Sequence, residues 1–136
     1  MEAVAKLRNC SMSARKMRLV VDLIRGKSVD EALGILKFTK KEAAEALTKL
    51  LLSAIANWEN KNNMTFNADD YDLYIKRIFA DEGTMLKRIR PAPQGRAHRI
   101  RKRSCHVTLV IENRVPLYQT TEDEEVEVET VNEENE

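Results

Sequence analysis

The sequence has few aromatic residues, only two cysteines and no long apolar run. Its seven aromatic residues among 136 leave the core to be filled mainly by Leu, Ile, Val, Ala and Met. Cys10 and Cys105 have neither a metal-binding nor a redox spacing, so we expect reduced thiols in a cytosolic protein. The longest largely apolar stretch, residues 50–56, is too short to cross a bilayer, and the first ten residues lack the pattern of a signal peptide. These shortages argue against a membrane partner.

Motifs for catalysis, cofactor binding and metal binding are also lacking. The sequence contains no Gly-rich phosphate loop and no paired-carboxylate motif. A metal site would have to use Cys10, His98, Cys105 or His106, and neighbouring residues of a strand point to opposite faces, so Cys105 and His106 do not chelate one ion together. We expect Cys105 in the core and His106 on the sheet surface. The sequence therefore predicts a protein that is not an enzyme and that uses neither a cofactor nor a metal.

Charge of one sign is missing from the end of the chain, and the formal net charge of +1 hides this unevenness. Residues 122–136 hold nine of the 22 acidic residues and no basic one. The other 13 acidic residues stand against all 23 basic ones over residues 1–121, which gives that part a net charge of +10. We therefore predict a basic domain followed by an acidic tail, whose charge density favours disorder in isolation.

Three helices are predicted in the first half of the chain. Met17, Val20, Val21 and Ile24 form one apolar stripe of a helix that Ser11 or Ser13 caps and that ends at residues 25–26. Two further helices, over about 28–37 and 40–60, each open with the spacing of a capping box, Ser28 with Glu31 and Thr39 with Glu42.

Alternating apolar and polar residues predict three strands, over residues 3–8, 73–80 and 105–111. Because the helices are bunched before the last two strands, the order indicates an α+β fold. We expect three helices packed on one face of a small three-stranded antiparallel sheet.

The stretch between the last two predicted strands, residues 83–104, reads GTMLKRIRPAPQGRAHRIRKRS and contains no acidic residue. Its centre, PAPQG, has turn chemistry because proline fixes φ and glycine is permissive. If the flanking strands continue to this turn, they form a long protruding β-hairpin whose arms of about nine residues span roughly 30 Å. The eight basic residues of the stretch are Lys87, Arg88, Arg90, Arg96, Arg99, Arg101, Lys102 and Arg103.

A solvated surface loop is the alternative interpretation of this basic run. Three features favour a binding arm: the run lacks the mixed charges of an ordinary surface, it prefers arginine to lysine, and two strands bracket it. An isolated two-stranded ribbon is marginal in water, and repulsion among like charges weakens it further, so we infer that a polyanion orders the hairpin. RNA fits because its phosphates line both arms while guanidinium groups and His98 stack on or hydrogen-bond to bases.

A second basic surface is expected at the first predicted helix. A solvated helix face and a set of phosphate contacts explain its cations equally well from the residues alone. These cations are Arg15, Lys16, Arg18, Arg25 and Lys27.

Several motifs resemble the large-subunit ribosomal protein L twenty-two family. The string KRIRPAPQGRAHRIRKRSCHVTLVI is similar to the C-terminal signature of that family, and SARKMRLVVDLIRGKSVDEALGIL, SAIAN and IFADEG follow the family's order. The resemblance covers about residues 3–114 and so implies one domain over residues 1–114 and a tail over residues 115–136. It implies a non-catalytic cytoplasmic protein that is a structural constituent of the large ribosomal subunit. Such a protein binds large-subunit ribosomal RNA, with the first helix contributing, and aids subunit assembly.

The same resemblance implies where the hairpin lies. In the family the globular part sits near the end of the nascent-peptide exit tunnel and the hairpin tip lines the tunnel wall. The implied partners of this single copy are ribosomal RNA, neighbouring ribosomal proteins and the nascent peptide. Arg96 would lie at the tunnel constriction and near macrolide-type antibiotic sites, although the neutral Ala92, Pro93 and Gln94 depart from the family's basic tip. The implied tip comprises Arg90, Pro91, Ala92, Pro93, Gln94, Gly95 and Arg96.

Two questions stay open from the sequence. The hairpin could instead belong to a protein-interaction module that grips an acidic partner, and nuclease treatment would separate this from RNA binding. The acidic tail lies beyond the resemblance and has three interpretations: it docks on a basic neighbouring ribosomal protein, it shields the basic body before assembly, or it is a solvated appendage.

Overall fold

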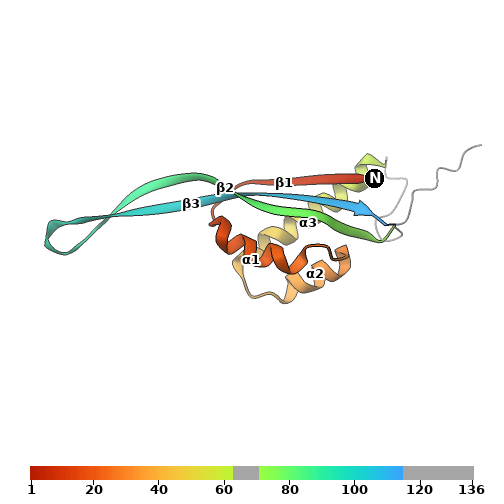
Figure 1. Ribbon diagram of the computed structural model, residues 1–136, viewed down its shortest axis with the longest axis horizontal. Helices are drawn as coiled ribbons and strands as arrows, with labels where there is room; N and C mark the ends of the chain where they lie inside the picture. Colours follow the sequence, from red (N-terminus) through yellow and green to blue (C-terminus); the bar gives the residue numbers. More distant parts are fainter. Residues whose placement is uncertain (63–70, 115–136) are drawn as a thin grey trace, which may run out of the picture.

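The structure, a computed structural model, describes residues 1–62 and 71–114, and the predicted acidic tail lies outside these ranges. Three strands form an antiparallel sheet in the order β1-β3-β2, so β3 is the central strand. The helices cover one face of this sheet, and the hairpin of β2 and β3 projects well beyond it (Figure 1). The predicted α+β fold is confirmed. The elements are β1 (Glu2–Cys10), α1 (Ala14–Ile24), α2 (Val29–Phe38), α3 (Glu42–Lys61), β2 (Leu73–Pro91), the short 3-10 turn η2 (Pro93–Gly95) and β3 (Ala97–Asn113).

The core lies between the helices and one face of the sheet. Along β3, Cys105, Val107, Leu109 and Ile111 alternate toward the helices and are fully buried or nearly so. They meet the apolar stripe of α1 and the buried face of α3, in which Trp58 is the largest buried side chain. Trp58 is the one buried aromatic side chain of the described core. The prediction that aliphatic residues fill most of the core is therefore confirmed.

The helix starts agree only partly with the predicted caps. Ser28 caps α2 as expected, because its Oγ accepts the backbone N–H of Glu31 at 3.4 Å. Ser13 is the N-cap residue of α1, but its hydroxyl makes no capping hydrogen bond. The prediction that Thr39 caps the third helix is wrong, since Lys41 is the N-cap of α3. Thr39 instead ends α2, where its hydroxyl donates to the carbonyl oxygen of Ile35 at 2.7 Å.

Helix side chains cover the outer edges of both edge strands over the body of the sheet. An uncovered edge would present unpaired backbone groups to other chains. Lysine and asparagine side chains of α3 donate to carbonyls of β1, and two arginines of α1 donate to carbonyls of β2. The bonds are Lys61 Nζ to Glu2 O at 2.8 Å, Asn57 Nδ2 to Val4 O at 3.1 Å, Arg18 Nε to Ala80 O at 3.0 Å and Arg25 Nη2 to Ile78 O at 3.5 Å.

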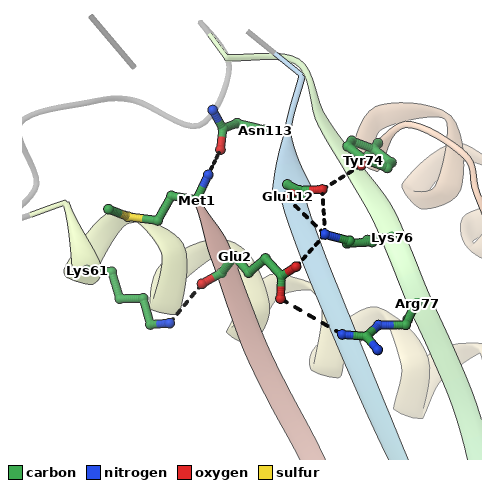
Figure 2. Close-up of polar contacts among 8 residues, drawn as sticks. All are labelled: Met1, Glu2, Lys61, Tyr74, Lys76, Arg77, Glu112 and Asn113. Carbon is green, nitrogen blue, oxygen red and sulfur yellow. Dashed lines mark hydrogen bonds and ion pairs between the residues drawn. The ribbon is translucent and has the colours of Figure 1, made fainter. Parts of the chain in front are cut away.

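A polar network ties the three strands together at the end of the sheet away from the hairpin (Figure 2). Lys76 of β2 binds the carboxylates of Glu2 and Glu112, and the Tyr74 hydroxyl donates to Glu112 at 2.6 Å. The hydrogen bond from Tyr74, with a smaller contribution from Lys76, holds the pKa of the Glu112 carboxyl below its usual value. Since β1, β3 and β2 each contribute a residue, the network fixes the strand ends in register.

Candidate nucleic-acid interface

The arm, defined as residues 83–104, is a continuous two-stranded ladder without a core. Seven consecutive pairs run from Met85 with Arg103 to Pro91 with Ala97. Every side chain from residue 84 to residue 103 is exposed except that of Ala92, and Ile89 is 74% exposed. Both strands continue to the turn, as the predicted long hairpin requires. The arm is therefore held by its backbone hydrogen bonds and not by apolar burial.

The register of the arm separates most of its positive charges. Met85, Leu86 and Ile89 of β2 stand opposite Arg103, Lys102 and Arg99, and Ile100 of β3 stands opposite Arg88. Directly opposed like charges destabilise a sheet, and Lys87 with Arg101 is the one such pair of lysine and arginine in the described ladder. This arrangement gives the ladder a high charge density at a reduced internal repulsion.

Both faces of the arm are basic. Cross-strand partners point to the same face and successive residues alternate, so the register assigns the cations to two sets. One face carries Lys87, Arg99, Arg101 and Arg103; the other carries Arg88, Arg90, Lys102 and His98. A polyanion that wraps the arm would therefore meet positive charge on either side.

None of the arm cations forms an ion pair with the residues that the structure describes. The described ion pairs all lie in the body. The acidic residues nearest in sequence, Asp81 and Glu82, precede the arm at its base, and the arm itself contains none. Among the described residues, these cations make one side-chain hydrogen bond, which Arg88 donates to the Lys87 carbonyl oxygen at 3.0 Å. The charge is thus left for an external anion.

A β-bulge joins the arm to the body. The register shifts between Glu82 and Met85, so that Gly83 and Thr84 together stand opposite Ser104. The Ser104 hydroxyl donates to the Thr84 carbonyl oxygen at 2.6 Å. A Cβ at Gly83 would lie 2.5 Å from Ser104 Oγ and 3.2 Å from the Ser104 carbonyl carbon, so the bulge needs glycine here. The sequence analysis did not predict this bulge. The glycine that precedes the basic run, Gly83, was the feature that could have indicated it.

The base of the arm and the start of α1 form one grooved surface. A groove of about 660 Å³ lies between them, and a smaller one of about 320 Å³ adjoins it. Arg15 and Lys16 therefore share a surface with the arm, a proximity that the sequence did not predict. Glu42 and Glu82 are the acidic residues of these walls. The basic residues that line the two grooves are Arg15, Lys16, Arg101, Lys102 and Arg103.

The other cations of the first-helix set are placed differently. Arg18 and Arg25 donate to carbonyls of β2, and Arg25 also pairs with Asp22 at 2.7 Å. Lys27 pairs with Glu31 at 2.6 Å. These three residues therefore have partners within the protein, and any phosphate contact they make adds to a structural role.

The tip is a tight turn whose backbone matches the predicted chemistry. Gly95 has a φ of +70°, and the Ala92 N–H donates to the Arg96 carbonyl oxygen at 2.8 Å. Gln94 also has a positive φ, of 61°, a conformation that the sequence did not suggest. The turn presents the implied tip residues 90–96 to the outside, and none of their side chains is buried.

The cysteines and His106 lie in the body. Cys105 is fully buried, as predicted, and pairs in register with Cys10 of β1. Burial, reinforced by the neighbouring Cys10 thiol, raises the pKa of Cys105 to about 11. His106 Nδ1 accepts the backbone N–H of Asn9 at 3.0 Å, where the strand has a positive φ. His106 thus has a structural partner, which the prediction of a surface histidine did not include.

Residues 1–62 and 71–114 contain no group of three or more His, Cys, Asp and Glu side chains placed to hold a metal ion. Within the same ranges, no helix combines the length and the apolar character needed to span a membrane.

The sequence of the chain matches a known family over nearly the whole described part. The model of the family described as Ribosomal protein L22p/L17e matches residues 5–112. The chain belongs to this family. L22-family membership makes it a structural, non-enzymatic constituent of the large ribosomal subunit, in the cytoplasm.

Relatives of the L22 family with high identity come from several bacteria, and each is named large ribosomal subunit protein uL22. That of Christiangramia forsetii is 63% identical over 109 residues, 80% of either chain. That of Flavobacterium johnsoniae is 62% identical over 109 residues, 80% of this chain and 79% of the relative. That of Bacteroides fragilis strain YCH46 is 58% identical over 110 residues, 81% of this chain and 79% of the relative. The resemblance drawn from the motifs is confirmed.

Proposed function

We propose that this L22-family protein binds large-subunit ribosomal RNA through the arm and the groove at its base. The observation that supports this is the arm itself: eight cations, no acidic residue, and no ion partner among the described residues. Lysine and arginine gain affinity for RNA by neutralising phosphates and releasing counterions. The body is the scaffold that holds one end of the arm while RNA orders the other.

The salt dependence of RNA affinity tests this proposal. Arg99→Gln, Arg101→Gln and Arg103→Gln together remove three cations of one arm face. Each lost phosphate contact lowers the slope of log affinity against log salt by about 0.7–0.9, so the triple variant should lose roughly 2–3 from the slope. Filter binding of large-subunit ribosomal RNA from Flavobacterium johnsoniae across a salt series measures it.

The matched control removes three exposed cations from the body: Lys49→Gln, Arg77→Gln and Arg114→Gln. Exposed ion pairs contribute little to stability, so both triple variants should fold. The control should keep the slope of the wild type. A salt-independent affinity, or equal losses in both variants, would contradict phosphate binding by the arm.

We further propose that the tip, residues 90–96, lines the nascent-peptide exit tunnel and that RNA binding by the arm aids subunit assembly. The exposed turn at the far end of the basic arm supports this placement. The partners would then be ribosomal RNA, neighbouring ribosomal proteins and the nascent peptide, with one copy in each particle. A photoreactive amino acid at position 94, in assembled ribosomes, should crosslink to a radiolabelled nascent chain. The same probe at position 49 should not, and equal labelling from both sites would remove the proposal.

A further inference from the structure

Phe38 is the most exposed large apolar side chain of the described residues. It is the last residue of α2, and 82% of its surface is accessible. The other helix positions that face outward with large apolar side chains, Leu19, Leu23 and Leu52, are between 45% and 56% exposed. A phenyl ring that is 82% exposed gains little apolar burial from the fold, so its face is open to a partner.

Three lysines surround this ring in sequence, and all are exposed. Lys37 precedes Phe38, and Lys40 and Lys41 follow it after a single threonine. None of the three forms an ion pair within residues 1–62 and 71–114. Glu42, the nearest acidic residue in sequence, lines the groove at the base of the arm. The turn between α2 and α3 therefore combines an aromatic face with unpaired positive charge.

The turn that carries Phe38 is held at both ends. The Thr39 hydroxyl donates to Ile35 O at 2.7 Å, and the Thr39 N–H donates to Leu36 O at 3.3 Å. On the other side, the Lys41 N–H donates to Thr39 O at 2.9 Å, and the Lys41 carbonyl accepts the first helical bond of α3 at 2.8 Å. The ring is thus presented from a fixed backbone, which reduces the entropy lost on binding.

We propose that Phe38, with Lys37, Lys40 and Lys41, forms a second RNA-binding site, in which an unpaired base stacks on the phenyl ring and lysines contact the flanking phosphates. This inference rests on the proposed RNA binding and adds a site remote in sequence from the arm. The lysines favour RNA over an apolar protein surface because three uncompensated charges would have to be desolvated against such a partner. An aromatic face accepts any base, so the site reads an unpaired nucleotide and not a sequence.

Substitutions at position 38 separate stacking from simple apolar contact. Phe38→Ala should weaken binding of the Flavobacterium johnsoniae large-subunit RNA by roughly 5- to 150-fold, the effect of losing one base–aromatic stack. The salt slope should stay unchanged, since no phosphate contact is lost. Phe38→Trp should keep the affinity, whereas Phe38→Leu should lose it. Lys40→Gln with Lys41→Gln should instead lower the slope by about 1.4–1.8.

Phe79→Ala is the matched control, because Phe79 is a second exposed phenylalanine, on the helix-free face of the sheet, and should leave affinity unchanged. Crosslinking at 254 nm followed by mass spectrometry should place a nucleotide on the peptide that contains Phe38. Wild-type affinity in Phe38→Ala would overturn the site while leaving the arm proposal standing. Retained affinity in Phe38→Leu would overturn stacking, because a leucine supplies apolar contact without an aromatic face. Failure of the wild type itself to bind RNA would instead remove the proposed function.

Discussion

The central strand β3 passes through two regions that differ in what stabilises them. From Cys105 to Ile111, alternate side chains are buried against the helices, whereas every side chain from Ala97 to Arg103 is exposed. The backbone ladder with β2 runs through both regions and is interrupted by two bulges, one between the regions and one at Lys76 in the body. A regular backbone ladder therefore does not show which of the two regions contributes most of the free energy of folding. The body is stabilised by apolar burial, and the arm keeps its register without it.

The largest expected effect comes from removing a large aliphatic side chain in each half of β3. Leu109→Ala empties a fully buried position and should lower the free energy of unfolding by about 2–5 kcal/mol. Ile100→Ala, in the arm, removes a side chain that is 38% exposed and packs on no core, so its effect should stay below about 1 kcal/mol. Urea unfolding followed by circular dichroism measures both. Equal losses would show that the arm contributes to the cooperative core, and the comparison would fail.

The junction between the two regions gives an intermediate effect. Gly83→Ala places a methyl group against Ser104, including its backbone, and should destabilise the protein by about 1–3 kcal/mol. Gly34→Ala is the matched control, because a Cβ there meets nothing within 4 Å and α2 is helical, so stability should rise by about 0.5–1 kcal/mol. Thermal unfolding of the two variants gives the comparison. An unchanged melting temperature in Gly83→Ala would mean that the bulge rearranges freely.

The helices and strands of the body were largely predictable, because the spacing of apolar residues along a short segment indicates which face is buried. The stripe of Met17, Val20, Val21 and Ile24 and the alternation along residues 105–111 each report the face that is buried. Thr39 was misassigned because capping-box spacing does not say which of two adjacent helices its hydroxyl will bind. The strand order, with β3 in the centre, depends on contacts between distant segments and has no local signal.

The interface was predictable in its charge and less so in its geometry. The basic run and the turn located the arm, but Arg15 and Arg18 look alike in the sequence. The structure places Arg15 in a groove at the base of the arm and uses Arg18 to cover an edge carbonyl of β2. The difference arises from the packing of α1 against the sheet, which fixes the direction of each side chain. Charge patterns thus identify a surface, while individual roles require the fold.

The smallest effect concerns acid, to which the two regions should respond differently. The arm contains no carboxylate, whereas Glu112 joins the three strands of the body through Tyr74 and Lys76. Its pKa is lowered in the folded state by the hydrogen bond from Tyr74 and by Lys76, so its contribution is present above the ordinary carboxyl range. That contribution is lost as the pH falls through the lowered pKa. Glu112→Gln should therefore lose less stability than the wild type between neutral pH and acid.

Glu45 offers the matched control for this acid dependence. Its pKa is also lowered, by a hydrogen bond from Lys49, but its side chain is 76% exposed, against 24% for Glu112. Water screens an exposed pair of this kind, so Glu45→Gln should leave the acid dependence close to that of the wild type. Urea midpoints at neutral pH and near pH 3 measure the three proteins. If Glu45→Gln removed as much of the acid dependence of stability as Glu112→Gln, acid would act through surface charge in general. The network of Glu112 with Tyr74 and Lys76 would then not explain why the body and the arm respond differently to acid.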